Sequence, residues 1–161
     1  MRSVLSVAVL LGAIVARPAR SQVVDSVLIG VTAVDAVVLM DWDDRMSATA
    51  GKAKDEYMGQ VRTRFTLELR KIGVIVEGSA NTLACKVQFI FDPVGLVAYR
   101  VDIEYFEPVR TTRQGRLLYS PLWMTGSIGL VGRANLEGDS VGRWCAERFG
   151  NAWLAANPPR R

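Results

Sequence analysis

The densest group of possible metal ligands in the sequence is Asp41, Asp43 and Asp44, which follow an apolar run. Several carboxylate oxygens close together suit a hard cation such as Ca²⁺. The spacing lacks the central glycine and distal glutamate of a calcium-binding loop, and aspartates after a strand commonly serve as turn and cap residues. We therefore expect no metal and no cofactor, with these three aspartates as the candidate ligands if a metal does bind.

Three arginines, Arg110, Arg113 and Arg116, recur every three residues in the polar stretch 108–116, which we interpret as a connection. Guanidinium groups on an exposed connection can clamp the phosphate or carboxylate groups of an envelope polymer or lipid. The alternative is a solvated loop whose charges keep a sheet edge from aggregating. Both interpretations place the three side chains in solvent.

Two apolar side chains are further candidate contacts. Leu67 lies opposite the apolar stripe of a predicted helix, so we expect it to face solvent. Trp123 is one of four tryptophans, which either line an interface or pack in the core, as Trp144 and Trp153 on the last helix are placed to do. The predicted partner-binding residues are Leu67, Arg110, Arg113, Arg116 and Trp123.

Histidine is absent from the chain, which limits the possible chemistry. Its absence excludes Ser-His-Asp and Cys-His machinery, histidine-bound zinc or iron, and histidine as a general base. Residues 126–132, GSIGLVG, match neither G-x-G-x-x-G nor the P-loop pattern, and we interpret them as a strand exit. We therefore predict a non-enzymatic protein; the alternative is a carboxylate-dependent hydrolase that acts on cell-envelope material.

The first 21 residues predict export. Arg2 precedes an unbroken run of small and apolar residues from Val4 to Ala16, and the small residues Ala19 and Ser21 suit cleavage after Ser21, with cleavage after Ala16 as the alternative. This run is shorter than the ~20 apolar residues of a spanning helix. We predict a signal peptide over residues 1–21, with an uncleaved anchor as the alternative, and a single periplasmic or secreted domain over residues 22–161. Membrane contact is expected only through the signal peptide before cleavage.

Cleavage changes the charge of the chain. Residues 1–21 contain three arginines and no acid, so the mature chain has 17 basic and 16 acidic residues. A nearly neutral chain offers no concentrated basic surface, which argues against a nucleic-acid partner. The remaining ~140 residues suit one domain with one core. We expect the partner to be another envelope protein or envelope component.

Cys85 and Cys145 are the two cysteines of the chain, and both survive cleavage. An oxidising compartment permits a disulfide between them, from an expected strand to the expected last helix. The alternative is two free cysteines that act as small buried hydrophobes. A metal site made of two cysteines without histidine is not expected.

Apolar periodicity predicts the elements that carry these residues. A stripe with helical spacing ends at Ile72 before Gly73, a residue suited to a left-handed cap, and the helix begins at Ser47 or at Asp55. Its members are Met58, Val61, Phe65, Leu69 and Ile72. A second helix is expected from about Asp139, as N-cap, to about Ala156, with a stripe of Val141, Cys145, Phe149, Ala152 and Ala156.

Five segments have strand character. They are a strand within 31–40 that is buried on both faces, the short run 74–76, the alternating pair 83–91 and 96–107, and 117–125, which Pro121 confines to an edge or interrupts. The expected fold is α+β: a two-layer sandwich of a mainly antiparallel sheet of about five strands with both helices on one face.

Three segments carry a resemblance to small exported bacterial proteins of uncharacterised function: ELRKIGV at 68–74, WMTGSIG at 123–129 and FGNAWLAANP at 149–158. The order of elements is also similar to that of the N-terminal domain of the periplasmic TolB protein. These resemblances imply an envelope interaction module, without a catalytic motif.

Overall fold

The computed structural model describes residues 26–42, 51–91, 96–132 and 135–158. The predicted signal peptide and its cleavage site therefore lie outside the described residues. The same holds for Asp43, Asp44 and the predicted turn at 92–95. None of the described helices combines the length and the hydrophobicity of a transmembrane span.

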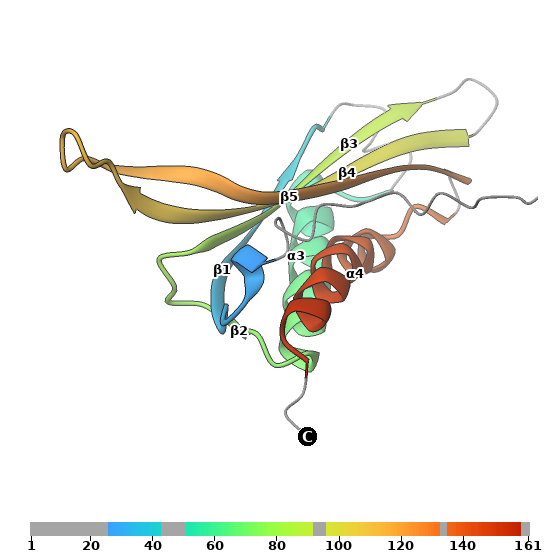
Figure 1. Cartoon of the computed structure of the whole chain (residues 1–161). Coiled ribbons are helices and arrows are strands. Elements are labelled where there is room, and N and C mark those ends of the chain that lie inside the picture. Colours follow the sequence, from blue (N-terminus) through green and yellow to red (C-terminus); the bar gives the residue numbers. More distant parts are fainter. Residues whose placement is uncertain (1–25, 43–50, 92–95, 133–134, 159–161) are drawn as a thin grey trace, which may run out of the picture.

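The chain folds into two layers, with one five-stranded sheet and two helices on a single face of it (Figure 1). The elements are the 3-10 turn η1 (Ser26–Leu28), β1 (Ala33–Met40), α3 (Lys54–Lys71), β2 (Ile75–Val76), β3 (Thr82–Phe91), β4 (Leu96–Arg110), β5 (Leu117–Gly132) and α4 (Gly138–Ala156). The predicted α+β fold, with a mostly antiparallel sheet and two helices, is confirmed.

The strands lie in the order β2-β1-β3-β4-β5. β1 runs parallel to both of its neighbours, whereas β3, β4 and β5 form an antiparallel meander. The prediction that the first strand is buried on both faces is wrong. Val34, Ala36 and Val38 turn toward the helices, but Leu39 on the opposite face is 48% exposed. This face of the sheet has no helix over it, so only alternate residues are buried.

Helix α3 packs the predicted stripe into the core. Val61, Phe65 and Leu69 are fully buried, and Tyr57 joins them one turn earlier. The helix ends as its sequence indicates: Gly73 has a φ of +92°, its N–H donates to the Arg70 carbonyl at 3.0 Å, and the Val74 N–H donates to the Leu69 carbonyl at 3.1 Å. This pair of bonds is a Schellman cap, which turns the chain directly into β2.

Helix α4 packs along α3 (Figure 1). It begins at Gly138, after Glu137, so the prediction of Asp139 as N-cap is wrong, and Asp139 instead lies in the first turn. Gly142 allows the close approach of the two helices: a Cβ atom there would lie 2.5 Å from the Val61 carbonyl oxygen and 2.7 Å from the Arg64 Cβ. Such distances leave no room for a side chain.

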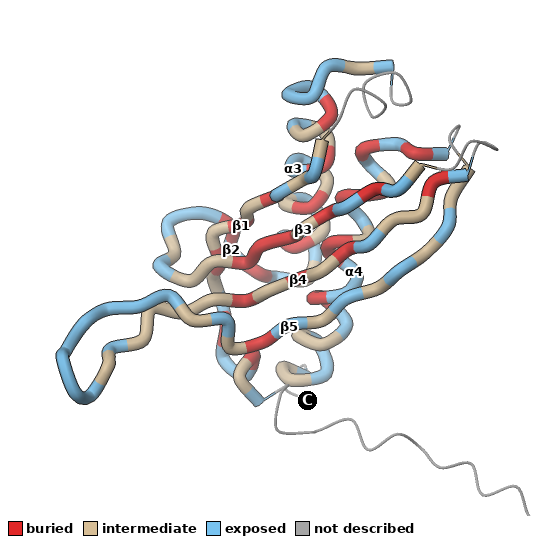
Figure 2. The backbone as a smooth tube through the Cα atoms, turned by 90° about the horizontal axis from the view of Figure 1, so that it is seen from above, coloured by how far each residue is buried: buried red, intermediate tan, exposed pale blue. Residues whose placement is uncertain are grey.

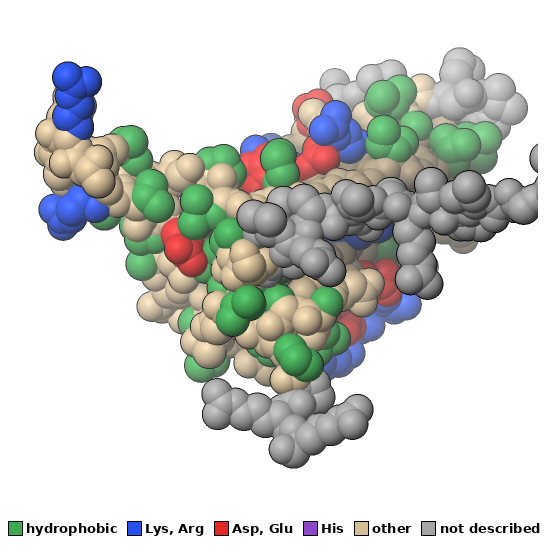
Figure 3. All heavy atoms as spheres, in the orientation of Figure 1, with side chains coloured by type: hydrophobic (Ala, Val, Ile, Leu, Met, Phe, Trp, Pro, Cys, Tyr) green, Lys and Arg blue, Asp and Glu red, His purple; other side chains and the backbone are tan. Residues whose placement is uncertain are grey.

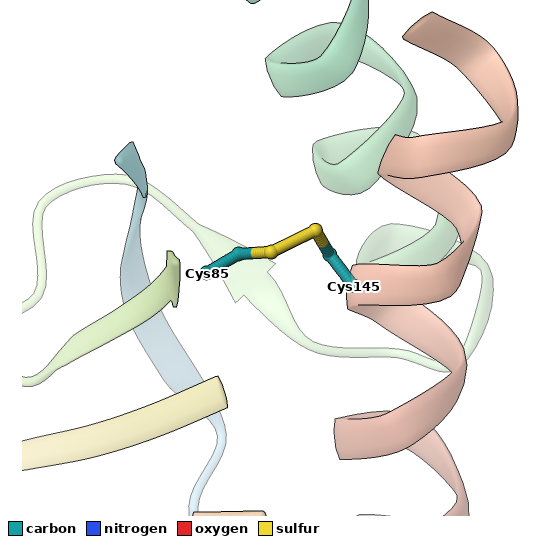
Figure 4. Close-up of a disulfide and its surroundings, with 2 residues drawn as sticks. All are labelled: Cys85 and Cys145. Carbon is teal, nitrogen blue, oxygen red and sulfur yellow. A yellow bond between two sulfur atoms is a disulfide. The ribbon is translucent and has the colours of Figure 1, made fainter. Parts of the chain in front are cut away.

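A disulfide joins the two layers. Cys85 on β3 and Cys145 on α4 are bonded, with their Cα atoms 5.8 Å apart (Figure 4). Of the two interpretations of these cysteines, the bridged one is therefore confirmed. Both residues are fully buried among the apolar side chains of the sheet and the helices. The bond thus fixes α4 to the centre of the sheet.

The end of α4 also holds the beginning of the described chain. Asn157 accepts a hydrogen bond from the Gly30 N–H at 2.8 Å and donates one to the Leu28 carbonyl at 2.8 Å. The Trp153 indole N–H donates to the Val31 carbonyl at 2.7 Å. Two residues of α4 and its cap therefore satisfy three backbone groups of the segment that leads into β1.

Candidate functional site

The most prominent surface feature is a hairpin that projects beyond the two-layer body. Pairing of β3 with β4 stops at Phe106, opposite Thr82, whereas β4 and β5 stay paired as far as Arg110, opposite Leu117. We call residues Glu107–Ser120 the arm; Figure 1 shows it at the left, past the helices. The prediction that a connection begins at Pro108 is thus wrong by three residues, because β4 continues to Arg110.

An irregularity in the ladder marks the base of the arm. Tyr105 pairs with Trp123 but Phe106 pairs with Pro121, so β5 contains one extra residue, Leu122, at this point. β5 is the last strand of the sheet, and this agrees with the expectation that Pro121 lies at an edge or an interruption. A bulge bends the strand that contains it and increases the local twist. The arm therefore leaves the sheet at a defined point.

Hydrogen bonds within the tip hold its turn. The Thr111 N–H donates to the Arg116 carbonyl at 2.9 Å, and the Gly115 N–H donates to the Thr111 carbonyl at 2.9 Å. Gly115 has a φ of +62°, a conformation that favours glycine. The Arg110 Nη1 donates to the Gly115 carbonyl at 3.2 Å. The tip therefore has an ordered backbone from which side chains extend.

The charge of the arm is positive. Arg110, Arg113 and Arg116 are exposed around the tip, where Figure 3 shows the basic side chains at the left end of the molecule. The sequence has no acidic residue between Glu107 and Glu137. Within the described chain, none of the three arginines has a carboxylate oxygen within 4.0 Å. The guanidinium groups are thus available to an anion.

Apolar side chains lie directly beside these charges. Leu117, Leu118 and Tyr119 are 57%, 51% and 61% exposed, and residues 112–119 form an unbroken exposed run (Figure 2, pale blue). Successive strand residues point to opposite faces, so Leu118 lies on one face of the arm and its two neighbours on the other. Three adjacent large exposed hydrophobics on a projecting hairpin are typical of a contact surface.

The base of the arm contains a buried phenol. The Tyr105 ring is fully buried, and its hydroxyl donates to the Glu107 Oε1 at 2.5 Å. Burial raises the pKa of Tyr105 well above its usual value, and the hydrogen bond to the Glu107 carboxylate raises it further. The phenol therefore stays protonated and holds the one carboxylate of the arm at its base, away from the arginines.

The structure does not bring the five predicted contact residues together. The three arginines share the arm, but Leu67 is 45% exposed on α3, in the helix layer. Trp123 is 4% exposed and packs edge-on against Phe149, with ring centroids 6.0 Å apart. The prediction that Trp123 contacts a partner is therefore wrong, because the residue faces the helices. Trp144 stacks on Tyr99 with centroids 4.3 Å apart, and Trp153 also packs in the body, as predicted for both.

The glycines of residues 126–132 lie inside β5, not at a strand exit as predicted. Gly129 makes room for an aromatic ring: a Cβ there would lie 2.5 Å from the Tyr99 ring, which stacks on Trp144. The expectation of a tight backbone is thus met at this glycine, with an aromatic side chain as the neighbour and not a phosphate.

The acidic residues do not gather into a metal site within the described residues. Asp41 is exposed after β1, and no three Cys, Asp or Glu side chains stand close enough there to hold a metal ion. A hollow of about 420 Å³ between α3 and α4 contains two carboxylates, Glu68 and Glu147. The hydrogen bond from Lys71 and the nearby guanidinium of Arg64 lower the pKa of Glu68. A general acid needs the opposite shift, so this hollow does not favour the hydrolase.

No protein-family model matches the chain, and no curated protein matches it either. Three chains of known structure match, among them a minor lipoprotein from Acinetobacter baumannii seen by crystallography. The two sequences are 11% identical, the match covers 75% of this chain and 94% of that chain, and the TM-score is 0.33. A likeness at this level carries no argument about fold or function. The resemblances stated from the sequence remain predictions.

Proposed function

We propose that this protein is an exported, non-enzymatic binding protein that contacts an envelope protein or another envelope component through the arm. The observation that carries this proposal is the arm itself: an ordered hairpin that projects from the body, with exposed apolar side chains beside exposed arginines. A two-stranded ribbon in water gains little stability of its own. Its length and its apolar surface therefore fit a role in contact with a partner.

The chemistry of the arm specifies the kind of surface that it fits. Arg113 and Arg116 suit phosphate or carboxylate groups, because a guanidinium binds either with two parallel hydrogen bonds. Leu117, Leu118 and Tyr119 supply the apolar contact that a purely ionic site would lack. Interface hot spots are rich in tyrosine and arginine. The partner we propose thus presents anionic groups next to an apolar surface.

Two features support export. The first is the leader-like sequence of residues 1–21, with its apolar run and small residues before a cleavage point. The second is the Cys85–Cys145 disulfide, since disulfides persist in oxidising compartments and are rare in the cytosol. Mass spectrometry of the exported protein should find residues 1–21 missing. An intact Met1 in the membrane fraction would contradict export with cleavage of a signal peptide.

Site-specific photo-crosslinking in cells tests the role of the arm. A benzophenone amino acid replaces Leu118 on the arm or, as a matched control, Leu154 on α4, which is 44% exposed. We expect a discrete adduct from position 118 and none of the same mass from position 154. The adduct should disappear in the triple variant Arg110→Gln, Arg113→Gln, Arg116→Gln. Identical adducts from both positions, or no adduct from position 118, would contradict the proposal.

A further inference from the structure

The edge of the sheet opposite the arm is incomplete. β1 has eight residues, but β2 pairs with only its first two, Ala33 with Ile75 and Val34 with Val76. No other described strand lies on that side of β1, so residues 36–40 form an open edge. A strand inside a sheet has hydrogen-bonded neighbours on both sides. An unpaired stretch of edge can instead serve as a template for another strand.

Backbone hydrogen bonds on both sides of β1 fix which of its backbone groups face this opening. The N–H groups of Ile75 and Glu77 donate to the carbonyls of Thr32 and Val34, so the backbone N–H and C=O groups of the even-numbered residues of β1 face β2. The backbone N–H of Asp35 donates to the Asn81 carbonyl, and that of Asp41 donates to the Val87 carbonyl. The backbone groups of the odd-numbered residues therefore face β3. Since the phase continues along a strand, Ala36, Val38 and Met40 direct their N–H and C=O groups toward the open edge.

The path of β2 explains why these positions stay open. Glu77 has a φ of 120° and Gly78 a φ of 71°, and both values take the chain out of the extended conformation directly after Val76. The ladder with β1 therefore stops at the Glu77 N–H, one pairing before Ala36. The side chain of Ser79 then bonds back to the Ala33 carbonyl at 3.1 Å, which fixes the turn away from the edge.

A groove of about 350 Å³ lies between the open edge and α3. Ala36, Val37 and Val38 line it from β1, and Asp55, Met58, Gly59 and Arg62 line it from α3, which Figure 2 shows beside β1. The groove therefore has a strand edge on one side and a helix on the other. This is the arrangement in which an added strand gains main-chain hydrogen bonds from the edge and side-chain contacts from the helix.

Gly59 is a second, independent indication that the groove accommodates another chain. A glycine inside a helix costs roughly 0.5–1 kcal/mol relative to alanine. Gly142 has a packing reason for this cost, because a Cβ would clash with α3, but a Cβ on Gly59 would meet no atom within 4 Å. Packing within the chain thus does not require the glycine. A glycine here does keep this wall of the groove flat.

The groove carries one charge of each sign. Arg62 and Asp55 are both exposed, and neither has an oppositely charged partner within 4.0 Å in the described chain. Because α3 leads directly into β2, Arg62 lies nearer the β2 end of the groove and Asp55 nearer the far end. A strand that continues β2 would pass Arg62 first and Asp55 last.

We propose that the open edge and α3 form a second binding site, which takes an extended peptide segment as an added parallel strand in line with β2. The added strand pairs with Ala36 and Val38, places a small or β-branched side chain over Gly59, and carries an acidic residue near its start for Arg62 and a basic one near its end for Asp55. This site lies at the opposite edge of the sheet from the arm and is independent of it.

The test uses the folded chain with its disulfide and the acetylated, amidated peptide Glu-Thr-Val-Thr-Val-Lys, labelled with fluorescein for titration. Amide hydrogen exchange of the saturated complex should slow at Ala36, Val38 and Met40. It should stay unchanged at Val37 and Leu39, whose N–H groups point to β3. Absence of binding, slowed exchange along β5 instead, or concentration-dependent self-association through this edge would each overturn the proposal.

Two variants sharpen this test. Gly59→Leu fills the groove while leucine is a better helix former than glycine, so the variant should fold and lose peptide binding. Arg62→Gln should weaken binding about tenfold, the worth of one charge-assisted hydrogen bond. The matched control Arg148→Gln, at an exposed position on α4, should bind normally. Peptide affinity that Gly59→Leu leaves intact would overturn the site.

Two further measurements fix the geometry and separate this site from the arm. The charge-reversed peptide Lys-Thr-Val-Thr-Val-Glu should bind several-fold more weakly, and equal affinity would overturn the parallel, charge-matched arrangement. The triple arginine variant of the arm should bind the first peptide normally. Loss of peptide binding in that variant would contradict the independence of the two sites.

Discussion

The strands β4 and β5 run through two environments, a buried one in the body and a solvent-exposed one in the arm. In the body, Val101, Ile103 and Tyr105 of β4 are fully buried beneath the helices. In the arm, a few residues along the same strands, Leu117, Leu118 and Tyr119 stand in solvent. The arm has fewer apolar residues than the body, but its three large ones at 117–119 are as hydrophobic as those of the core, so the hydrophobicity of a side chain alone does not decide whether it is buried. The difference depends on where β3 and the helix layer end.

Under the proposed function, this contrast separates stability from recognition in one pair of strands. Burial of apolar area is the main term that stabilises the body, and the disulfide and the helix pair add to it. The arm contributes little to that balance because its large side chains remain exposed. Changes in the body should therefore alter the free energy of unfolding, whereas changes in the arm should alter binding alone.

Truncation of a core ring gives the largest expected effect. Phe65→Ala should lower the free energy of unfolding by ~3–5 kcal/mol, because the ring is fully buried between α3 and the sheet and leaves a cavity. Leu118→Ala on the arm should change it by less than ~0.5 kcal/mol. Urea denaturation of both variants measures the difference. Equal losses would mean that the arm packs as the body does.

Loss of the disulfide should come next. The double variant Cys85→Ala, Cys145→Ala should lose roughly 2–4 kcal/mol, since the bond closes a long loop and constrains the unfolded chain. Thiol counting under denaturing, non-reducing conditions should find no free thiol in the wild type. Two free thiols per chain would contradict the bond, and a stable double variant would mean that burial alone holds α4 on the sheet.

Two helix glycines provide a matched pair of smaller effects. Gly142→Ala should cost ~1–3 kcal/mol, because the new methyl group would overlap the Val61 carbonyl and the Arg64 side chain. Gly59→Ala should raise stability by up to ~1 kcal/mol, because nothing stands in the way and the unfolded chain loses freedom. Thermal denaturation of the two variants under one buffer compares them. A gain of stability in both would mean that the helix contact is looser than the structure indicates, and a loss in both would mean that Gly59 has a packing role after all.

Local patterns in the sequence are sufficient to predict most of the body. The spacing of Val61, Phe65 and Leu69 indicates α3 and its buried face, and Gly73 indicates where the helix ends. Strict alternation in 83–91 and 96–107 indicates the β3–β4 pair. These signals are reliable because each depends on one period and one cap, within a single element.

Features that depend on distant parts of the chain are not visible in the sequence. Residues 108–110 look like a polar connection because Pro108 and Arg110 interrupt the apolar pattern. They remain a strand because β5 continues to pair with them after β3 has ended. Whether Cys85 reaches Cys145 likewise depends on how α4 lies across the sheet, which no local period specifies.

The candidate sites show the same limit. The spacing of the arginines in the arm indicates their exposure, whereas the burial of Trp123 is not predicted from the sequence, because its phase on β5 depends on the extra residue at the bulge. Asn157 looks like a helix terminator, yet it also binds the backbone at Leu28 and Gly30. The open edge of β1 has no signal at all, because it arises from the early end of β2.

The solvent-facing side of the helix layer is intermediate between the buried body and the exposed arm. A change there should have the smallest effect on the free energy of unfolding. Lys71 donates to the Glu68 Oε1 at 2.9 Å, and the Arg64 guanidinium lies 2.7 Å from the same oxygen. These cations lower the pKa of Glu68 in the folded protein. Because the folded pKa lies below the unfolded value of about 4.3, the ionised carboxylate stabilises the fold above that pH, and this contribution is lost as the pH falls through the folded pKa.

Glu68→Gln should therefore lower stability slightly at pH 7, by about 0.5 kcal/mol or less as for other ion pairs on a helix surface, and should flatten the acid limb of the stability curve. Glu147→Gln on α4 is the matched control, because its carboxylate lines the same hollow without an ion pair within 4.0 Å in the described chain. Urea denaturation between pH 3 and pH 7 checks both variants. If Glu68→Gln steepened the acid limb, the pKa of Glu68 would have to be higher in the folded than in the unfolded chain. The hollow would then contain a carboxyl group with the raised pKa that a hydrolase needs.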